Sequence, residues 1–182
     1  KSKCTPELLE FFSFLRAPRM PLFWEEYDRG TSTLEEVTAT ISGMTGRPVE
    51  TCAAVLRLAV DLQEPVKPTE RLVGDLKAAG YRLYVLSNMS REFIDFLRRF
   101  PVYGLFDGEV VSCEEHTVKP EPRIYEILLE RYGLTPSETL FIDDGQKNVD
   151  AAQRLGFAVY MPGPGEDFGH ILDNLNRYEE IL

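Results

Sequence analysis

The spacing of hydrophobic residues divides the chain into two parts near residue 65. Residues 1–64 place apolar side chains at the spacing of amphipathic helices, and no strand pattern stands out among them. After Pro65 the pattern changes to short apolar runs that alternate with amphipathic stretches ending at glycine. That alternation is typical of parallel strands joined by helices. We therefore predict a helical domain in residues 1–64 and an α/β core with a doubly wound parallel sheet in residues 65–182.

Turn and capping residues set bounds for most of the expected elements. Ser32 followed by Glu35 fits a capping box and predicts a helix that ends near Gly43. A first-turn proline favours a helix over residues 5–15, and Pro48 opens another. The remaining helices are expected over residues 69–79, 91–100, 122–132 and 167–182, and the strands over residues 81–86, 108–112, 140–142 and 158–161.

Composition and charge narrow the classes of partner. With 43% hydrophobic residues among 182, the chain can bury a sizeable core. Its 30 acidic and 20 basic residues give a formal charge of −10, which argues against nucleic acid or an anionic membrane as a partner. The 3 cysteines form no Cys-x-x-Cys pair, no signal peptide is evident, and no apolar run approaches the length of a membrane span. We expect a cytoplasmic protein, either a monomer or a homodimer.

Two adjacent carboxylates follow the apolar run Leu140–Ile142, where a strand is expected to end and a helix to begin. The like charges of Asp143 and Asp144 repel unless a cation lies beside them, and carboxylate oxygens suit Mg²⁺. Ligands of open α/β sheets bind outside the carboxyl ends of the strands. Helix capping would explain one of the two acids but explains the pair less well. We therefore predict a magnesium site at this position.

Two further polar clusters follow expected strands upstream. Ser87 and Asn88 come directly after an apolar run, and a hydroxyl, an amide and the backbone N–H groups of a strand-to-helix turn can hold an anion. Lys119 precedes a proline-rich turn that fixes its direction, and its ammonium can neutralise a phosphate. Alone, the first cluster would indicate helix capping and the second a solvated surface charge. Together with the acidic pair, they predict a site for a phosphorylated small molecule.

The chain resembles the haloacid dehalogenase-like hydrolase superfamily in the ordered set Ser87-Asn88, Lys119-Pro120, Asp143-Asp144 and Asn148. It is most similar to the capped sugar-phosphate phosphatases of that group, including α-glucose-1-phosphatase-like members. The resemblance covers nearly the whole chain. It implies a Rossmann-like parallel-sheet core with an inserted helical-bundle cap. It also implies Mg²⁺-dependent hydrolysis of small phosphomonoesters, with sugar phosphates as the expected substrates, through an aspartyl-phosphate.

The same resemblance implies a role for each matching position. Lys119 would balance the charge of nucleophile and phosphate, and Asp143 would orient Lys119 or a metal-bound water. The dehalogenases of the superfamily carry small hydroxyl residues in place of the acidic pair, so the pair favours a phosphatase. The remaining positions would hold phosphoryl oxygens (Ser87 and the Asn88 amide), bind Mg²⁺ (Asp144) and support the metal shell (Asn148).

One part of the family's machinery has no counterpart in the printed sequence. The nucleophile and general acid are the two acids of an Asp-x-Asp motif that ends the first strand, and residues 1–182 contain no Asp-x-Asp. In this fold the strand lies between those ending at Ser87 and Asp144, and its loss would leave two buried strand edges unpaired. We therefore expect the strand to precede Lys1 in the full-length protein. The competing hypothesis is a non-catalytic relative that binds a ligand or a protein.

Overall fold

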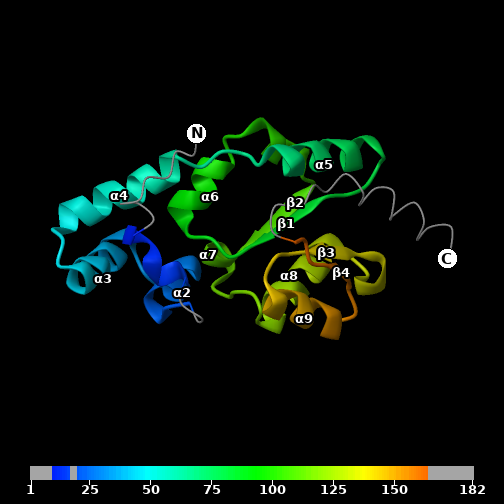
Figure 1. Ribbon diagram of the computed structural model, residues 1–182. Helices are drawn as coiled ribbons and strands as arrows, with labels where there is room; N and C mark the ends of the chain where they lie inside the picture. Colours follow the sequence, from blue (N-terminus) through cyan, green and yellow to red (C-terminus); the bar gives the residue numbers. More distant parts are fainter. Residues whose placement is uncertain (1–9, 17–19, 164–182) are drawn as a thin grey trace. The chain divides into compact units, whose positions relative to one another are not determined.

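The computed structural model describes residues 10–16 and 20–163 (Figure 1). The chain divides into two compact units. The first holds Lys1–Glu64, Asn88–Leu97 and Val111–Val118, and the second holds Pro65–Ser87, Arg98–Val110 and Lys119–Leu182. Two short segments of the expected α/β core therefore group with the helical residues. The division into a cap of residues 1–64 and a core of residues 65–182 stays a prediction, and the helix expected over residues 167–182 lies outside the described part.

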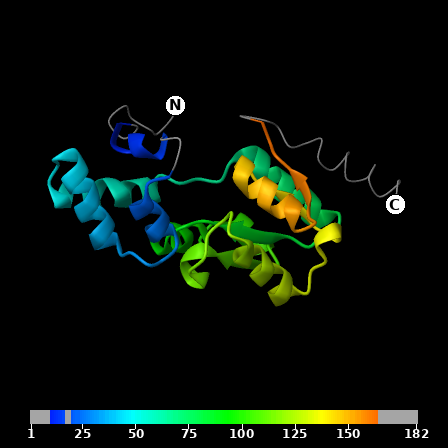
Figure 2. The same ribbon diagram turned by 90° about the horizontal axis from the view of Figure 1, so that it is seen from below.

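The described residues of the first unit are mainly helical. Its two longest helices, α3 and α4, pack side by side (Figure 2). Apolar residues at helical spacing form one core, whose buried members are Phe11, Trp24, Tyr27, Val37, Ile41, Cys52 and Leu56. The elements are η1 (Ser13–Arg16), α2 (Leu22–Asp28), α3 (Leu34–Thr45), α4 (Val49–Asp61), α6 (Arg91–Leu97) and α7 (Ser112–Glu115).

Helix α3 begins one residue later than the sequence pattern predicted. Thr33 is the N-cap: its hydroxyl accepts the Glu36 N–H at 3.2 Å, and the Glu36 carboxylate accepts the Thr33 N–H at 2.8 Å. The predicted box, Ser32 with Glu35, is therefore wrong by one residue, because two overlapping frames of the sequence fit the same motif. The helix is closed by Gly46 in the left-handed conformation, three residues beyond the predicted position.

The second unit alternates helices with short strands, as predicted. Helix α8 and strand β3 have the expected bounds. Strand β1 starts at Tyr84 rather than Tyr81, because the Leu83 N–H binds the Asp107 carboxylate at 2.8 Å instead of a neighbouring strand. None of the helices in the described part has the length and apolar character to cross a bilayer. The elements are α5 (Lys67–Ala78), β1 (Tyr84–Ser87), η2 (Pro101–Leu105), β2 (Gly108–Val111), α8 (Pro122–Tyr132), η3 (Pro136–Glu138), β3 (Leu140–Ile142), α9 (Gln146–Arg154) and β4 (Ala158–Tyr160).

Helices cover both faces of β3. Leu140 and Ile142 pack with residues of α5, whereas Phe141 packs with residues of α8 and α9. Successive side chains of a strand point to opposite faces of the sheet. The second unit therefore has the three layers of an α/β fold.

The strands form two separate pairs instead of the single sheet that was expected. Strands β3 and β4 are parallel, with Leu140 opposite Ala158, and β1 pairs with β2. Within residues 20–163, β1 has no partner other than β2, and β3 has none other than β4. All four residues of β1 are only half-buried, although a strand inside a parallel sheet is covered on both faces. Strands β1 and β3 thus each keep one edge without a strand partner in the described residues.

Candidate active site

Asp143 lies immediately after β3, and its carboxylate is held from two directions. One oxygen, Oδ1, accepts the Gly145 N–H at 2.8 Å and the Asn148 side-chain amide at 2.9 Å. The other, Oδ2, accepts the Lys119 ammonium at 2.6 Å. Both oxygens are thus engaged by donors of the protein itself. This arrangement fixes the direction of the carboxylate, and it suits a residue that orients other groups.

Lys119 connects the ends of two strands of the second unit. Its ammonium donates to the Leu86 carbonyl of β1 at 2.8 Å and to the Asp143 carboxylate that follows β3. The side chains of Lys119 and Asp143 are only 10% and 7% exposed. The ammonium also lies 5.8 Å from the centre of the Phe141 ring. A buried cation is therefore fixed at the carboxyl ends of β1 and β3, where a phosphate would need a positive charge.

The loop between β3 and α9 has no room for a larger residue at Gly145. A Cβ atom there would lie 2.8 Å from Nδ2 of Asn148 and 3.0 Å from Oδ1 of Asp143. Tyr125 supports the same loop by donating to the Asn148 carbonyl at 3.0 Å. Burial, and then the charge of Asp143, raises the pKa of Tyr125, so its hydroxyl stays protonated and remains a donor.

Asp144 is exposed, unlike its neighbour. Both oxygens of Asp143 are occupied, so Asp144 is the member of the acidic pair whose carboxylate can reach a metal ion. Mg²⁺ usually keeps several waters and takes one or two protein carboxylates. Within residues 10–16 and 20–163, no three His, Cys, Asp or Glu residues come together as a metal cluster. The donor chemistry of Asp144 fits Mg²⁺.

Ser87 ends β1 in the second unit, and Asn88 begins a segment of the first unit. The two backbone N–H groups that follow are already bound inside the protein. The Met89 N–H donates to the Ser112 hydroxyl at 2.8 Å, and the Ser90 N–H donates to the Asp28 carboxylate. The N–H groups of Met89 and Ser90 are therefore not open to an anion. An anion here would depend on Ser87 and Asn88.

Sequence reasoning did not single out Asp28 or Ser112. Ser112 carried a weak signal, because it is a polar residue directly after a strand. Asp28 carried none, since it is one of several acids on a helical segment. Three positions do meet as the motifs suggested, namely Lys119, Asp143 and Asn148. The roles of these residues and of Ser87, Asn88 and Asp144 stay predictions.

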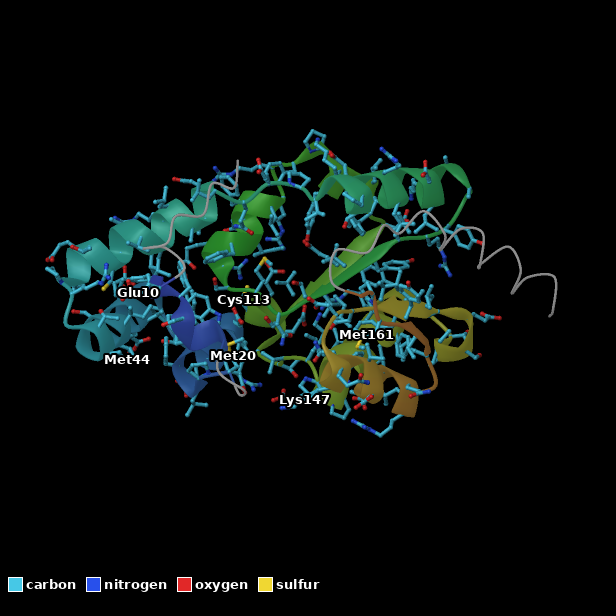
Figure 3. The ribbon with its side chains drawn as sticks, viewed as in Figure 1. Glu10, Met20, Met44, Cys113, Lys147 and Met161 are labelled. Carbon is cyan, nitrogen blue, oxygen red and sulfur yellow. The ribbon has the colours of Figure 1, made fainter. Side chains whose placement is uncertain are left out.

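A separate cavity of about 680 Å³ opens in the first unit. His116 is exposed in its wall, and its Nδ1 lies 3.2 Å from the Arg29 carbonyl. Cys113 of α7, marked in Figure 3, is a buried cysteine outside any disulfide, and it also lines the cavity. The cavity wall contains more acidic than basic residues. Its one arginine, Arg91, is already paired with Glu114. It therefore suits a phosphate less well than the surroundings of Lys119.

A family model described as haloacid dehalogenase-like hydrolase matches residues 8–156. The chain belongs to this family. A sesquiterpene phosphatase of Aspergillus oryzae, astK, is 30% identical over 134 residues, covering 73% of this chain and 68% of the relative. A D-ribitol-5-phosphate phosphatase of Bacteroides thetaiotaomicron is 28% identical over 159 residues, covering 80% and 73%.

A solved structure extends the likeness to the fold of this haloacid dehalogenase-like hydrolase. The wild-type enzyme BT-2542 of Bacteroides thetaiotaomicron, in complex with magnesium and inorganic phosphate, superposes with a TM-score of 0.73 and 26% identity. The match covers 92% of this chain and 91% of that one. The chain therefore has the haloacid dehalogenase-like α/β fold, and a homologue has been crystallised with magnesium.

Proposed function

We propose that the full-length protein is a Mg²⁺-dependent phosphatase that hydrolyses small phosphomonoesters, with sugar phosphates as the first class to test. The observation that carries the proposal is the buried ammonium of Lys119, fixed between Leu86 and Asp143 beside the exposed carboxylate of Asp144. Relatives named as phosphatases, and a structural neighbour that holds magnesium and phosphate, support it.

Each residue would contribute to binding or to charge balance. Lys119 would neutralise a phosphoryl oxygen while Asp143 and Asn148 hold its surroundings rigid. Ser87 and the Asn88 amide would donate hydrogen bonds to the other phosphoryl oxygens. Asp144 would hold Mg²⁺, which when bound draws negative charge from the transferring phosphoryl group.

The proposed nucleophile is a carboxylate at the end of a strand that pairs with both β1 and β3. Each has an edge without a strand partner in the described residues. The outer side of β2 is occupied, since the Tyr132 hydroxyl accepts the Glu109 N–H at 2.8 Å and donates to the Glu109 carbonyl at 2.9 Å. We therefore place the added strand between β1 and β3, where each has an edge without a strand partner in the described residues. Its carboxyl end would fall near Lys119, which already bridges the ends of both strands.

The reaction would proceed in two displacements. The carboxylate attacks phosphorus, an aspartyl-phosphate forms, and the substrate's oxygen leaves as an alcohol after taking a proton from a general acid. Water then loses a proton to the conjugate base of that acid and attacks phosphorus, which releases inorganic phosphate and regenerates both the carboxylate and the acid. Lys119 would stay bound to the phosphoryl oxygens through both steps.

A binding protein without catalysis is the competing candidate, because residues 1–182 hold no Asp-x-Asp. N-terminal sequencing and intact mass of the natural protein discriminate between the two. An Asp-x-Asp on an apolar run ahead of Lys1 supports the phosphatase. A natural start at Lys1 would favour the binding protein.

The decisive assay measures phosphate release by the full-length protein from a panel of phosphomonoesters, with Mg²⁺ or with EDTA. We expect Mg²⁺-dependent turnover, and a loss of about 100-fold or more in Asp144→Asn because a charged ligand becomes neutral. Asp150→Asn, an acid on α9 bonded to Gln146, is the matched control and should stay near the wild type. Equal turnover by Asp144→Asn and wild type would rule out the metal assignment.

A further inference from the structure

The turn that leads from β1 into α6 is held by a buried serine. Ser112 at the start of α7 is fully buried, and its hydroxyl accepts the Met89 N–H at 2.8 Å. The same hydroxyl donates to the Asp28 carbonyl at the end of α2. One side chain thus joins three segments of the first unit that lie far apart in the sequence.

Asp28 holds the next residue of the same turn. Its carboxylate accepts the backbone N–H of Ser90, a residue that is 1% exposed. The close approach of α2 to α7 requires a glycine at Gly30. Its φ is +73°, and an added Cβ would overlap the backbone of Cys113. Asp28 therefore sits in a tight contact that leaves it little freedom to move.

We propose that Asp28 and Ser112 are positioning residues that hold the Asn88–Ser90 turn for anion binding. They accept hydrogen bonds from the N–H groups of Met89 and Ser90, which fixes the backbone on the C-terminal side of Asn88. This inference rests on the proposed function, in which Asn88 binds a phosphoryl oxygen of the substrate. Because the turn is already ordered before the anion binds, less of the binding free energy is lost to ordering the backbone.

The positioning role does not include metal binding, because Asp144 is the residue proposed to hold Mg²⁺. Asp28, Ser90 and Ser112 all belong to the first unit, whereas Asp144 belongs to the second. Loosening the turn should therefore weaken phosphate binding and leave Mg²⁺ binding as it was. It should also raise KM more than it lowers kcat, since the turn contacts the phosphate in the ground state as well as in the transition state.

The test compares Asp28→Leu, which keeps the branched shape but replaces the acceptor oxygens by methyl groups, with Asp28→Asn, which keeps an acceptor oxygen. Ile41→Val is the control for a general loss of stability, because Ile41 is fully buried in the same unit. On the full-length protein we would measure amide hydrogen exchange at Met89 and Ser90. Calorimetry would give the Kd for inorganic phosphate with Mg²⁺ present and the Kd for Mg²⁺ alone.

We expect Asp28→Leu to speed exchange at Ser90 and to weaken phosphate binding, each by about tenfold, which is the loss of one hydrogen bond. Asp28→Asn should recover most of both, Ser112→Ala should act like Asp28→Leu at Met89, and Ile41→Val should leave the phosphate Kd unchanged. Faster exchange with an unchanged phosphate Kd, or unchanged exchange in Asp28→Leu, overturns the inference.

The outcome separates this inference from the function on which it rests. If the wild type binds phosphate and Asp28→Leu binds it equally well, only the positioning role fails. If the wild type binds no phosphate although Met89 and Ser90 are protected, the proposed function fails and the anion-binding role of the turn fails with it.

Discussion

Two lysine–carboxylate pairs in this protein show how burial changes the value of an ion pair. Lys119 and Asp143 lie 2.6 Å apart with side chains 10% and 7% exposed, whereas Lys67 and Glu70 lie 3.1 Å apart with Lys67 86% exposed. Water screens the second pair, so it contributes little to stability. Removing either partner of the first pair is strongly destabilising, because the remaining partner would be a buried charge without a counter-charge.

Replacing Lys119 by Met should therefore lower the free energy of unfolding by about 3 kcal/mol, because the Asp143 carboxylate stays buried without its cation. Lys67→Met, the control, should change it by about 0.5 kcal/mol or less. The double variant Lys119→Met/Asp143→Asn should recover part of the loss. Urea denaturation of all four proteins gives the comparison, and an equal cost for the two lysines would contradict it.

Asp28 gives a prediction about pH. Burial raises the pKa of Asp28 to about 7; the Ser90 N–H opposes this shift and the charge of Glu25 adds to it. Between about pH 4 and pH 7 the folded chain thus holds a proton that the unfolded chain has released. The contribution of Asp28 to stability is therefore greatest at acidic pH and is lost as the pH rises through 7.

Asp28→Asn should remove this dependence. Relative to wild type, we expect a larger gain in unfolding free energy at pH 8.5 than at pH 5, measured by urea denaturation at both values. Glu26→Gln changes an exposed acid on the same helix and should leave the difference between the two pH values as in wild type. A gain of equal size at both values would show that Asp28 titrates normally.

At the scale of elements, β2 shows how a strand edge is closed without another strand. The Tyr132 hydroxyl at the end of α8 binds both the N–H and the C=O of Glu109. The Tyr132 ring is also tilted against Tyr84 of β1, with centroids 4.7 Å apart. Gly108 leaves the space that this ring occupies, since a Cβ there would overlap it. Gly108 is therefore a strand glycine at a position where another side chain, Tyr132, comes close to the backbone.

Gly108→Ala should therefore displace Tyr132 and lower the unfolding free energy by about 1–3 kcal/mol. Gly43→Ala is its control, because Gly43 lies inside α3 with open space around its Cα and should gain about 0.5–1 kcal/mol. Thermal unfolding of both variants is sufficient. An unfolding free energy of Gly108→Ala equal to that of wild type would mean that the hydrogen bonds of Tyr132 to Glu109 do not stabilise β2.

At the scale of the whole molecule, the sheet is the unusual feature. Two-stranded sheets are marginally stable, and here two of them lie in one compact unit with helices packed on both faces of β3. The helices have the arrangement of a larger parallel sheet, while β1 is half-buried along its length. A strand inserted between β1 and β3 would pair with the edges that have no strand partner in residues 20–163, and it would bury those side chains. The proposed nucleophile and the completeness of the sheet thus depend on the same strand.

Much of the local structure could be predicted from short stretches of sequence. Helix α8 has a proline at its start and Gly133 in the left-handed conformation after its end, so its bounds were readable from neighbouring residues. The contact of Lys119 with Asp143 also agrees with the motifs, which put polar residues after the carboxyl ends of the strands. Local signals were misleading where two frames fit equally well, as at the start of α3.

Long-range contacts were not readable in this way. Ser112 and the Asp28 carbonyl are 84 positions apart, and no pattern near either residue indicates that they meet. Helix periodicity encodes which face of an element is buried, so the sequence predicted most of the described helices and strands, although not where α3 and β1 begin. It does not encode which polar groups from separate segments satisfy one another once packed, nor which strand edges remain without partners. Both kinds of contact depend on how the segments meet in three dimensions. Only the tertiary structure showed that the N–H groups of Met89 and Ser90 are already bound within the protein.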